Sequence, residues 1–132
     1  MFTLTLPTRH TDTFAATGFV HSGVLIALTE MTYAAFEKRV EIAKPATVVA
    51  VQAETQAKYY APLPWAEGAE GAELSITTLE ASKRGFVQVY EIRSATTGLQ
   101  ICAITHHWVW LDLVTGRRAP IPEDVVTKYR DA

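Results

Sequence analysis

The chain lacks the features that would place it in several large protein classes. It has one cysteine among 132 residues, Cys102, so no disulfide can form within the chain, and this suits a reducing compartment. Its formal net charge of −2 at pH 7 gives no broad electrostatic attraction to nucleic acid. Its longest apolar run, at residues 24–28, is too short to cross a bilayer. We therefore expect a cytoplasmic protein with neither a membrane nor a nucleic acid as its partner.

The chain does have enough apolar sequence for one core. Hydrophobic residues make up 48% of it and charged residues 20%, which is typical of a globular domain. Its length is that of one ordinary domain, so we expect a single domain over residues 1–132. The first twelve residues lack a cationic start followed by a long apolar run, and no signal peptide is expected there.

Residues 22–39 carry the clearest helix prediction. They contain no proline, and no glycine after Gly23, and they end in Lys-Arg, which suits the C-terminal turn of a helix. Ser22 is the expected N-cap. Apolar side chains lie nearly all round this helix, whereas a surface helix shows one apolar stripe. The helix is therefore expected to need cover on most of its sides.

The rest of the chain favours strands. Residues 2–9 alternate apolar and polar side chains at their start, and four later segments are rich in strand-forming residues: 47–60, 73–82, 86–95 and 99–113. The proline-punctuated residues 119–132 have room for a short terminal helix. A sheet that curls around one central helix satisfies both patterns, so the α+β class is expected. One helix cannot protect the sheet's edges, which favours pairing with a second copy.

Residues 18–30, GFVHSGVLIALTE, join the expected helix start to a carboxylate nine residues after a histidine. With the order of elements, they resemble the hotdog-fold acyl-CoA thioesterases, in which a curved antiparallel sheet wraps a long helix and two protomers join edge to edge. The segment is similar to the G-x-x-H-G-G-x-x-x-x-L-x-D/E signature of the branch that has its catalytic carboxylate on the central helix. His21 and Glu30 have that spacing, and Ser22 replaces the first glycine of the pair.

Residues 82–122 end in the pattern D-x-x-T-G-R-x-x-P-I-P. They resemble the C-terminal half of a sister branch, the 4-hydroxybenzoyl-CoA-like thioesterases. In that branch the catalytic carboxylate is an aspartate in the loop before the helix, and RHTD supplies Asp12. The sequence thus combines features of both branches, and both Glu30 and Asp12 stand as candidate catalytic carboxylates.

The chemistry of thioester hydrolysis fits these residues. Burying an unpaired carboxylate costs several kcal/mol, so Glu30 in an apolar helix indicates a task, either as nucleophile or as base for water. The N–H groups of Ser22 and Gly23 lie at the positive end of the helix and are candidates for holding the thioester carbonyl. Asp12 lies in a polar loop, where an Asx turn is the ordinary alternative.

Distance along the helix constrains how these groups meet. Ser22 and Glu30 are eight residues apart, which is roughly 12 Å at about 1.5 Å per residue. One carbonyl group does not reach both in a single chain. If both act, they come from two protomers, and the active site lies at a subunit interface. The hotdog resemblance implies the same arrangement, in a homodimer or a homotetramer.

Substrate binding is assigned to cations and to His21. His21 is expected to orient the substrate or the loop. Two short basic clusters, Lys83 with Arg84 and Arg117 with Arg118, suit the phosphates of CoA. Arg84 is the better candidate because the resembled family often has a basic residue there.

Metal binding is not expected. His106 and His107 are adjacent, so on a strand they point to opposite faces and cannot share an ion. No other cofactor is indicated by the sequence.

Two other functions remain open. One is a hotdog hydratase or dehydratase, although the glycine- and proline-rich loops of those enzymes are missing here. The other is a non-catalytic protein that binds acyl-CoA. Release of free thiol from acyl-CoA separates hydrolysis from both.

Overall fold

One antiparallel sheet carries the fold. The computed structural model describes residues 1–9, 12–14, 17–65 and 71–132. Its strands are β1 (Phe2–Leu6), β2 (Val48–Tyr59), β3 (Ala72–Ser82), β4 (Gly85–Ser94), β5 (Gln100–Asp112) and β6 (Arg118–Ala119), and its helices are α1 (Ser22–Arg39) and α2 (Glu123–Arg130). The strand order is β1-β3-β4-β5-β2, and the short β6 pairs with β5. The predicted α+β class is confirmed, with a six-stranded sheet.

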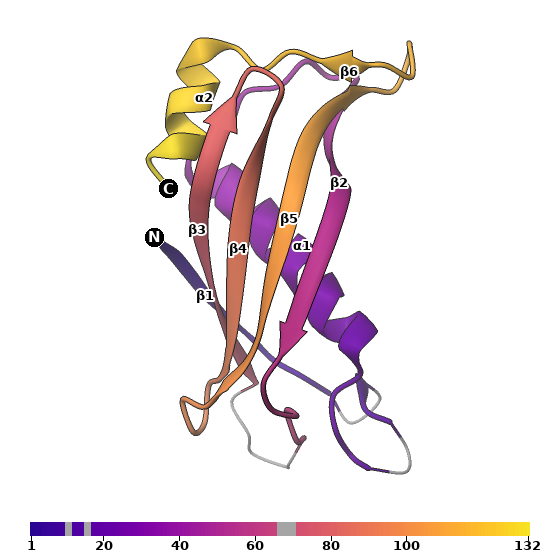
Figure 1. Ribbon diagram of the computed structural model, residues 1–132, viewed down its shortest axis with the longest axis vertical. Coiled ribbons are helices and arrows are strands. Elements are labelled where there is room, and N and C mark those ends of the chain that lie inside the picture. Colours follow the sequence, from indigo (N-terminus) through magenta and orange to yellow (C-terminus); the bar gives the residue numbers. More distant parts are fainter. Residues whose placement is uncertain (10–11, 15–16, 66–70) are drawn as a thin grey trace.

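The 18-residue helix α1 lies across one face of this sheet (Figure 1). Its bounds agree with the prediction for residues 22–39. The buried residues recur at helical spacing and form one stripe against the sheet: Leu25, Leu28, Thr29, Thr32, Tyr33 and Phe36. The apolar composition of this segment therefore does produce a packed helix.

The expectation that the sheet covers α1 on most sides is wrong for the single chain. A second stripe, which we call the open stripe, is exposed and consists of Ala27, Glu30, Met31 and Ala34. These residues have the i, i+3, i+4, i+7 spacing of one helix face. The sheet has one face to offer, so it covers one side of the helix and leaves the opposite side open.

The core joins both helices to the middle strands through aromatic rings. The Phe86 ring on β4 stacks on Tyr129 of α2 at 3.8 Å between centroids, and Tyr33 of α1 stacks on Trp108 of β5 at 4.3 Å. The Tyr33 and Tyr129 hydroxyls hydrogen-bond at 2.8 Å, so both phenols are satisfied inside the core. These contacts fix α2, the predicted terminal helix, at the same end of the sheet as the C-terminal half of α1.

β2 is an edge strand, and its residues 53–59 are exposed on both faces. The register to β5 shifts between Gln52 and Glu54, so Ala53 is a bulge residue that faces no partner. An edge that is exposed on both faces is a ready surface for pairing with another strand.

The four long strand predictions are confirmed, whereas β6 was not predicted because two residues carry no periodicity.

Candidate functional site

His21 caps the start of α1. Its backbone is extended, with φ −64° and ψ 138°, and its side-chain Nδ1 accepts a hydrogen bond from the Gly23 N–H at 2.8 Å. The prediction of Ser22 as N-cap is therefore wrong. The imidazole nitrogen reaches the second N–H of the helix just as a serine oxygen would, and this places the cap one residue earlier.

The remaining first-turn N–H groups can be assigned one by one. The N–H groups of Val24 and Leu25 donate to the His21 carbonyl at 2.9 and 3.2 Å. Within the part of the chain that the structure describes, the Ser22 N–H has no hydrogen-bond partner. The Gly23 N–H is occupied by His21, so of the two predicted carbonyl-binding groups Ser22 is the one that can receive a ligand.

Asp12 lies beside this helix start. Its carbonyl accepts the His21 N–H at 2.8 Å. Its carboxylate accepts the Arg9 N–H at 2.8 Å and lies 3.5 Å from the Arg9 guanidinium, and the side chain is 14% exposed. The loop thus brings Asp12 next to His21, but its carboxylate is already engaged by Arg9, three residues earlier, and not by the N–H two residues later that an Asx turn would use.

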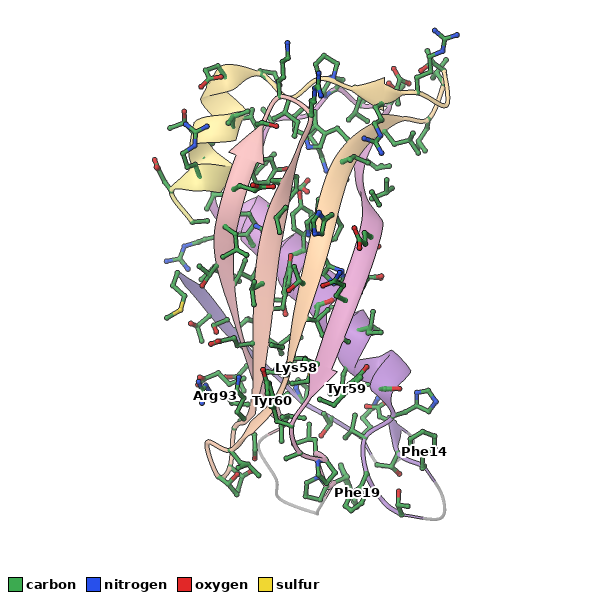
Figure 2. The ribbon with its side chains drawn as sticks, in the orientation of Figure 1. Phe14, Phe19, Lys58, Tyr59, Tyr60 and Arg93 are labelled. Carbon is green, nitrogen blue, oxygen red and sulfur yellow. The ribbon has the colours of Figure 1, made fainter. Side chains whose placement is uncertain are left out.

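An aromatic pocket opens next to Ser22. It has a volume of about 500 Å³ and is lined by Phe14, Thr17, Phe19, Val20, Ser22, Leu25, Tyr59, Tyr60, Ala61, Pro62 and Leu63. The four rings come from the loop before α1 and from the end of β2, and Figure 2 shows them at one end of the molecule. They are 38–52% exposed, which is unusual for large apolar groups and is typical of a binding surface.

Glu30 lies two turns further along α1, on the open stripe. Its Oε1 accepts a hydrogen bond from the Gln52 side chain of β2 at 3.2 Å. The sequence led us to expect this carboxylate in a pocket that excludes most water, and in the single chain it is exposed. The difference follows from the packing of α1, because Glu30 is on the side that the chain's own sheet does not cover.

A buried polar network lies directly behind Glu30. His106 of β5 is 0% exposed, and its Nε2 is 2.7 Å from the Thr29 hydroxyl of α1. Its Nδ1 is 2.8 Å from the Thr55 hydroxyl of β2. Burial lowers the pKa of His106 from 6.5 to about 4, so the ring is neutral near pH 7. From the sequence, His106 was weighed only as a metal ligand.

The turn between β3 and β4, which carries Lys83 and Arg84, lies at the opposite end of the sheet from the end of β2 and the start of α1, where the aromatic pocket opens (Figure 1). Lys83 and Arg84 form the turn between β3 and β4, and Arg118 begins β6. These three residues line a cleft of about 470 Å³, the basic cleft, together with Ala119 and Pro120. Arg117 lies in the preceding turn and does not line it. Arg118, the neighbour of Arg117 in the same predicted basic cluster, lines the cleft instead.

The two histidines behave as the strand prediction required. His106 points into the core and His107 lies half-buried on the opposite face. Among the described residues, no group of three or more His, Cys, Asp or Glu side chains is placed to hold a metal ion. In the same residues, neither helix is long and apolar enough to cross a membrane.

Comparisons with known proteins agree with this architecture. A family model described as the thioesterase-like superfamily matches residues 12–128. No curated protein sequence matches the chain. Among solved structures, a 1,4-dihydroxy-2-naphthoyl-CoA thioesterase from Synechocystis is similar with a TM-score of 0.81 at 20% identity, covering 98% of this chain and 96% of that one.

Two further solved structures give the same result. A gentisyl-coenzyme A thioesterase has a TM-score of 0.81 at 17% identity, covering 97% of this chain and 99% of that one. A thioesterase from Thermus thermophilus, complexed with coenzyme A and Zn, has a TM-score of 0.78 at 19% identity, covering 98% of this chain and 92% of that one. At these identities the likeness shows the fold, and it confirms the resemblance to hotdog-fold proteins.

Proposed function

Because the chain belongs to the thioesterase-like superfamily, we propose that it hydrolyses the thioester bond of an acyl-CoA to a free acid and CoA. The observation that carries this proposal is the helix start. The Ser22 N–H lies at the positive end of α1 and opens onto the aromatic pocket. A polarising donor beside an apolar pocket is the arrangement that a thioester carbonyl with a bulky acyl group requires.

The acyl group is assigned to the aromatic pocket. With the carbonyl oxygen at the Ser22 N–H, the acyl chain extends between the Phe14 and Phe19 rings on one side and Tyr59 and Tyr60 on the other. Flat rings bind another ring by stacking as well as by burial of apolar area. An aromatic or similarly bulky acyl group is therefore expected to be favoured over a short one such as acetyl.

Glu30 is assigned as the base or nucleophile, supplied by a second copy of the chain. Its carboxylate receives a hydrogen bond from the neutral Gln52, whereas Asp12 is already engaged by Arg9. Glu30 is too far along α1 to serve the Ser22 of its own chain. The open stripe and the free edge of β2 are the surfaces on which a second copy would pack, and that packing would enclose α1 as the central helix of a dimer.

The reaction then needs no cofactor. Water adds to the carbonyl carbon while Glu30 takes one of its protons, and the oxygen's developing charge is held at the Ser22 N–H. The carbon–sulfur bond breaks as the intermediate collapses, and the CoA thiolate leaves with the proton. Burial of Glu30 under the second copy would strengthen these charge interactions.

The first experiment compares the two carboxylates. Wild-type protein, Glu30→Gln and Asp12→Asn are assayed for thiol release from aromatic, short and long acyl-CoA substrates. We expect Glu30→Gln to lose at least about a hundredfold in turnover, the usual lower scale for an acid–base group. Asp12→Asn should lose much less. If Asp12→Asn abolishes turnover while Glu30→Gln stays near wild type, Asp12 is the catalytic carboxylate and Glu30 is not.

The same assay tests the reaction class. A wild-type protein that releases no thiol from any substrate would overturn the proposal. Loss of enoyl-CoA absorbance without thiol would identify a hydratase, and tight binding without either change would identify an acyl-CoA-binding protein.

Because the basic cleft and the aromatic pocket lie at opposite ends of one chain's sheet, the phosphates of CoA are assigned to the basic cleft of another copy of the chain. Lys83, Arg84 and Arg118 gather there on a chain with a net charge of −2, so the positive charge is local. Arg84→Ala should raise KM about fivefold with little change in kcat, corresponding to roughly 1 kcal/mol for an exposed charge pair. Arg118→Ala should behave like it. A larger effect from Arg117→Ala would move the phosphate site away from the cleft.

A further inference from the structure

A second groove begins one helical turn beyond Glu30. It has a volume of about 440 Å³ and lies between the C-terminal half of α1, the start of β2 and the loop that joins them. Glu30 binds Gln52 of β2, and the walls of the groove continue from this contact. Ala34 follows Glu30 on the same face of α1, and Ala50 precedes Gln52 on the same face of β2. The groove therefore leads away from the candidate base, in the direction opposite to the start of α1.

An ion pair lines the far part of this groove. Lys44, from the loop after α1, pairs with the carboxylate of Glu37, which lies two turns beyond Glu30 on the helix. The Lys44 and Glu37 side chains are 16% and 20% exposed, so neither ion is fully surrounded by solvent. The positions of both charges are therefore set by the protein around them.

The turn after α1 places Lys44 against the helix. The N–H of Ile42 donates to the Glu37 carbonyl at 3.0 Å, which reverses the chain in the pattern of a Schellman motif. Glu41 has the left-handed backbone, with φ 56°, that glycine usually provides in this motif. Its carbonyl accepts a hydrogen bond from Lys128 Nζ of α2 at 2.8 Å. The terminal helix thus holds the loop that carries Lys44.

The ion pair offers a donor and an acceptor side by side. An ammonium group has several N–H donors and a carboxylate several lone pairs, so the contact between Lys44 and Glu37 does not use them all. A secondary amide presents the complementary groups, a carbonyl and an N–H. The groove is apolar at Ala34, Val49 and Ala50, which suits methylene groups. Its lining therefore matches a chain of methylene groups joined by amides.

The geometry of a thioester decides which part of the substrate reaches this groove. Besides its oxygen, the carbonyl carbon carries the acyl group and the sulfur arm. The proposed function places the acyl group in the aromatic pocket of one copy, so the arm leaves past Glu30 of the other. The arm of CoA consists of methylene groups and amides and leads to the phosphates. β2 begins at the end of the sheet that carries the basic cleft (Figure 1), so the groove points toward the assigned phosphate site.

We propose that this groove holds the arm of CoA, with Lys44 donating to an amide carbonyl and Glu37 accepting from an amide N–H. The groove belongs to the copy that supplies Glu30. One copy then binds the acyl group, and the other binds the thiol side of the same substrate. This inference rests on the proposed function.

Thioesters that differ only in the arm test this assignment. The same acyl group is offered as its CoA thioester, as its pantetheine thioester, which keeps the amides and lacks the phosphates, and as its 2-mercaptoethanol thioester, which lacks both. Lys44→Met removes the donor, so it should raise KM at least about fivefold for CoA and pantetheine thioesters, the scale of one lost hydrogen bond. KM for the 2-mercaptoethanol thioester should stay within about twofold of wild type.

Two control variants make the comparison specific. Arg39→Met removes an exposed cation near the same end of α1 that lies next to β1, outside the groove, and should leave KM unchanged for all three thioesters. Arg84→Ala should raise KM for the CoA thioester alone, because only that substrate carries phosphates. An equal rise of KM for all three thioesters in Lys44→Met would show a structural defect and would overturn the inference.

Glu37 is tested by a conservative change. Glu37→Gln keeps an oxygen that accepts a hydrogen bond, whereas Glu37→Leu removes it. The leucine variant should therefore raise KM for the pantetheine thioester more than the glutamine variant does. Equal values of KM in both variants would remove Glu37 from the amide site.

Failure of this inference and failure of the proposed function give different results. If wild-type protein releases thiol from the CoA thioester and Lys44→Met keeps the wild-type KM, the thioesterase proposal stands and the inference is wrong. If wild-type protein releases thiol from none of the three thioesters, the proposed function fails and the inference fails with it.

Discussion

The two sides of α1 are made of similar residues and have different surroundings. On one side, the stripe from Leu25 to Phe36 is buried against the sheet, and even its two threonines are 0% exposed. On the other, the open stripe carries two alanines, Met31 at 55% exposure and the carboxylate of Glu30. Apolar composition alone would bury both sides equally.

The difference shows that a single chain provides a packing surface for only one of the two apolar sides of α1. A helix that is apolar on both sides needs two surfaces to pack on, and this sheet supplies one. The uncovered side also holds the candidate base, next to an edge strand without cover. The side that is closed in the single chain should govern stability, and the side that is open should govern association and catalysis.

The largest effect on stability is expected from a substitution on the buried side of α1. Phe36 is 1% exposed, and its ring lies 5.9 Å from that of Phe2 and 6.3 Å from that of Tyr129. Phe36→Ala should lower the free energy of unfolding by about 3–5 kcal/mol, because it leaves a cavity in the core.

The control for this variant is Met31→Ala on the open stripe. Measured by urea unfolding at protein concentrations too low for association, it should change the free energy of unfolding by no more than about 0.5 kcal/mol. A similar loss from both variants would mean that the two sides of α1 are equally well packed.

The second prediction uses pH to test the buried side. The unfolded chain takes up a proton on His106 near pH 6.5, whereas in the folded chain burial lowers this pKa to about 4. The contribution to stability is therefore complete above pH 6.5 and is lost as the pH falls toward 4. Between pH 6.5 and pH 5 the loss is about 1.6 kcal/mol.

Adjacent histidines provide the control for this pH effect. His106→Gln should remove that part of the pH dependence, while His107→Gln, on the outer face of the same strand, should retain it. Urea unfolding at the two pH values measures the difference, and carboxylate titrations cancel between the variants. An unchanged pH dependence in His106→Gln would show that His106 is not the group responsible.

Much of the fold followed from local patterns in the sequence. The bounds of α1 were predictable because residues 22–39 combine strong helix formers with cations at the end. The long strands were predictable from strand-forming residues between turn signals. The cap at His21 was missed because histidine is a rare N-cap, and no periodicity reveals which side chain reaches the helix start.

The site was less predictable because it depends on side chains that are distant in sequence. The aromatic pocket needs the loop before α1 and the end of β2 to converge, and the His106 network needs a bulge that shifts the phase of one strand. Two adjacent histidines on a strand indicate that one of them faces the core, but the sequence does not show which side chains hydrogen-bond to it. The spacing from His21 to Glu30 indicated the two candidates without showing that they lie on different surfaces.

The smallest effect is expected from Met31→Glu, a substitution that tests whether a second copy covers the open stripe. Met31→Glu places a charge next to Glu30, where a dimer interface would bury it without a partner. The dissociation constant measured by sedimentation should rise by at least about tenfold, or roughly 1.4 kcal/mol. Leu113→Glu is the control, because Leu113 is similarly exposed at 62% but lies in the turn after β5, and it should leave association unchanged. Since Glu30 of one copy is proposed to serve Ser22 of the other, thiol release by Met31→Glu should fall at low protein concentration and recover as the concentration rises. A wild-type protein that sediments as a stable monomer at micromolar concentration, yet is fully active, would show that the open stripe works without a second copy.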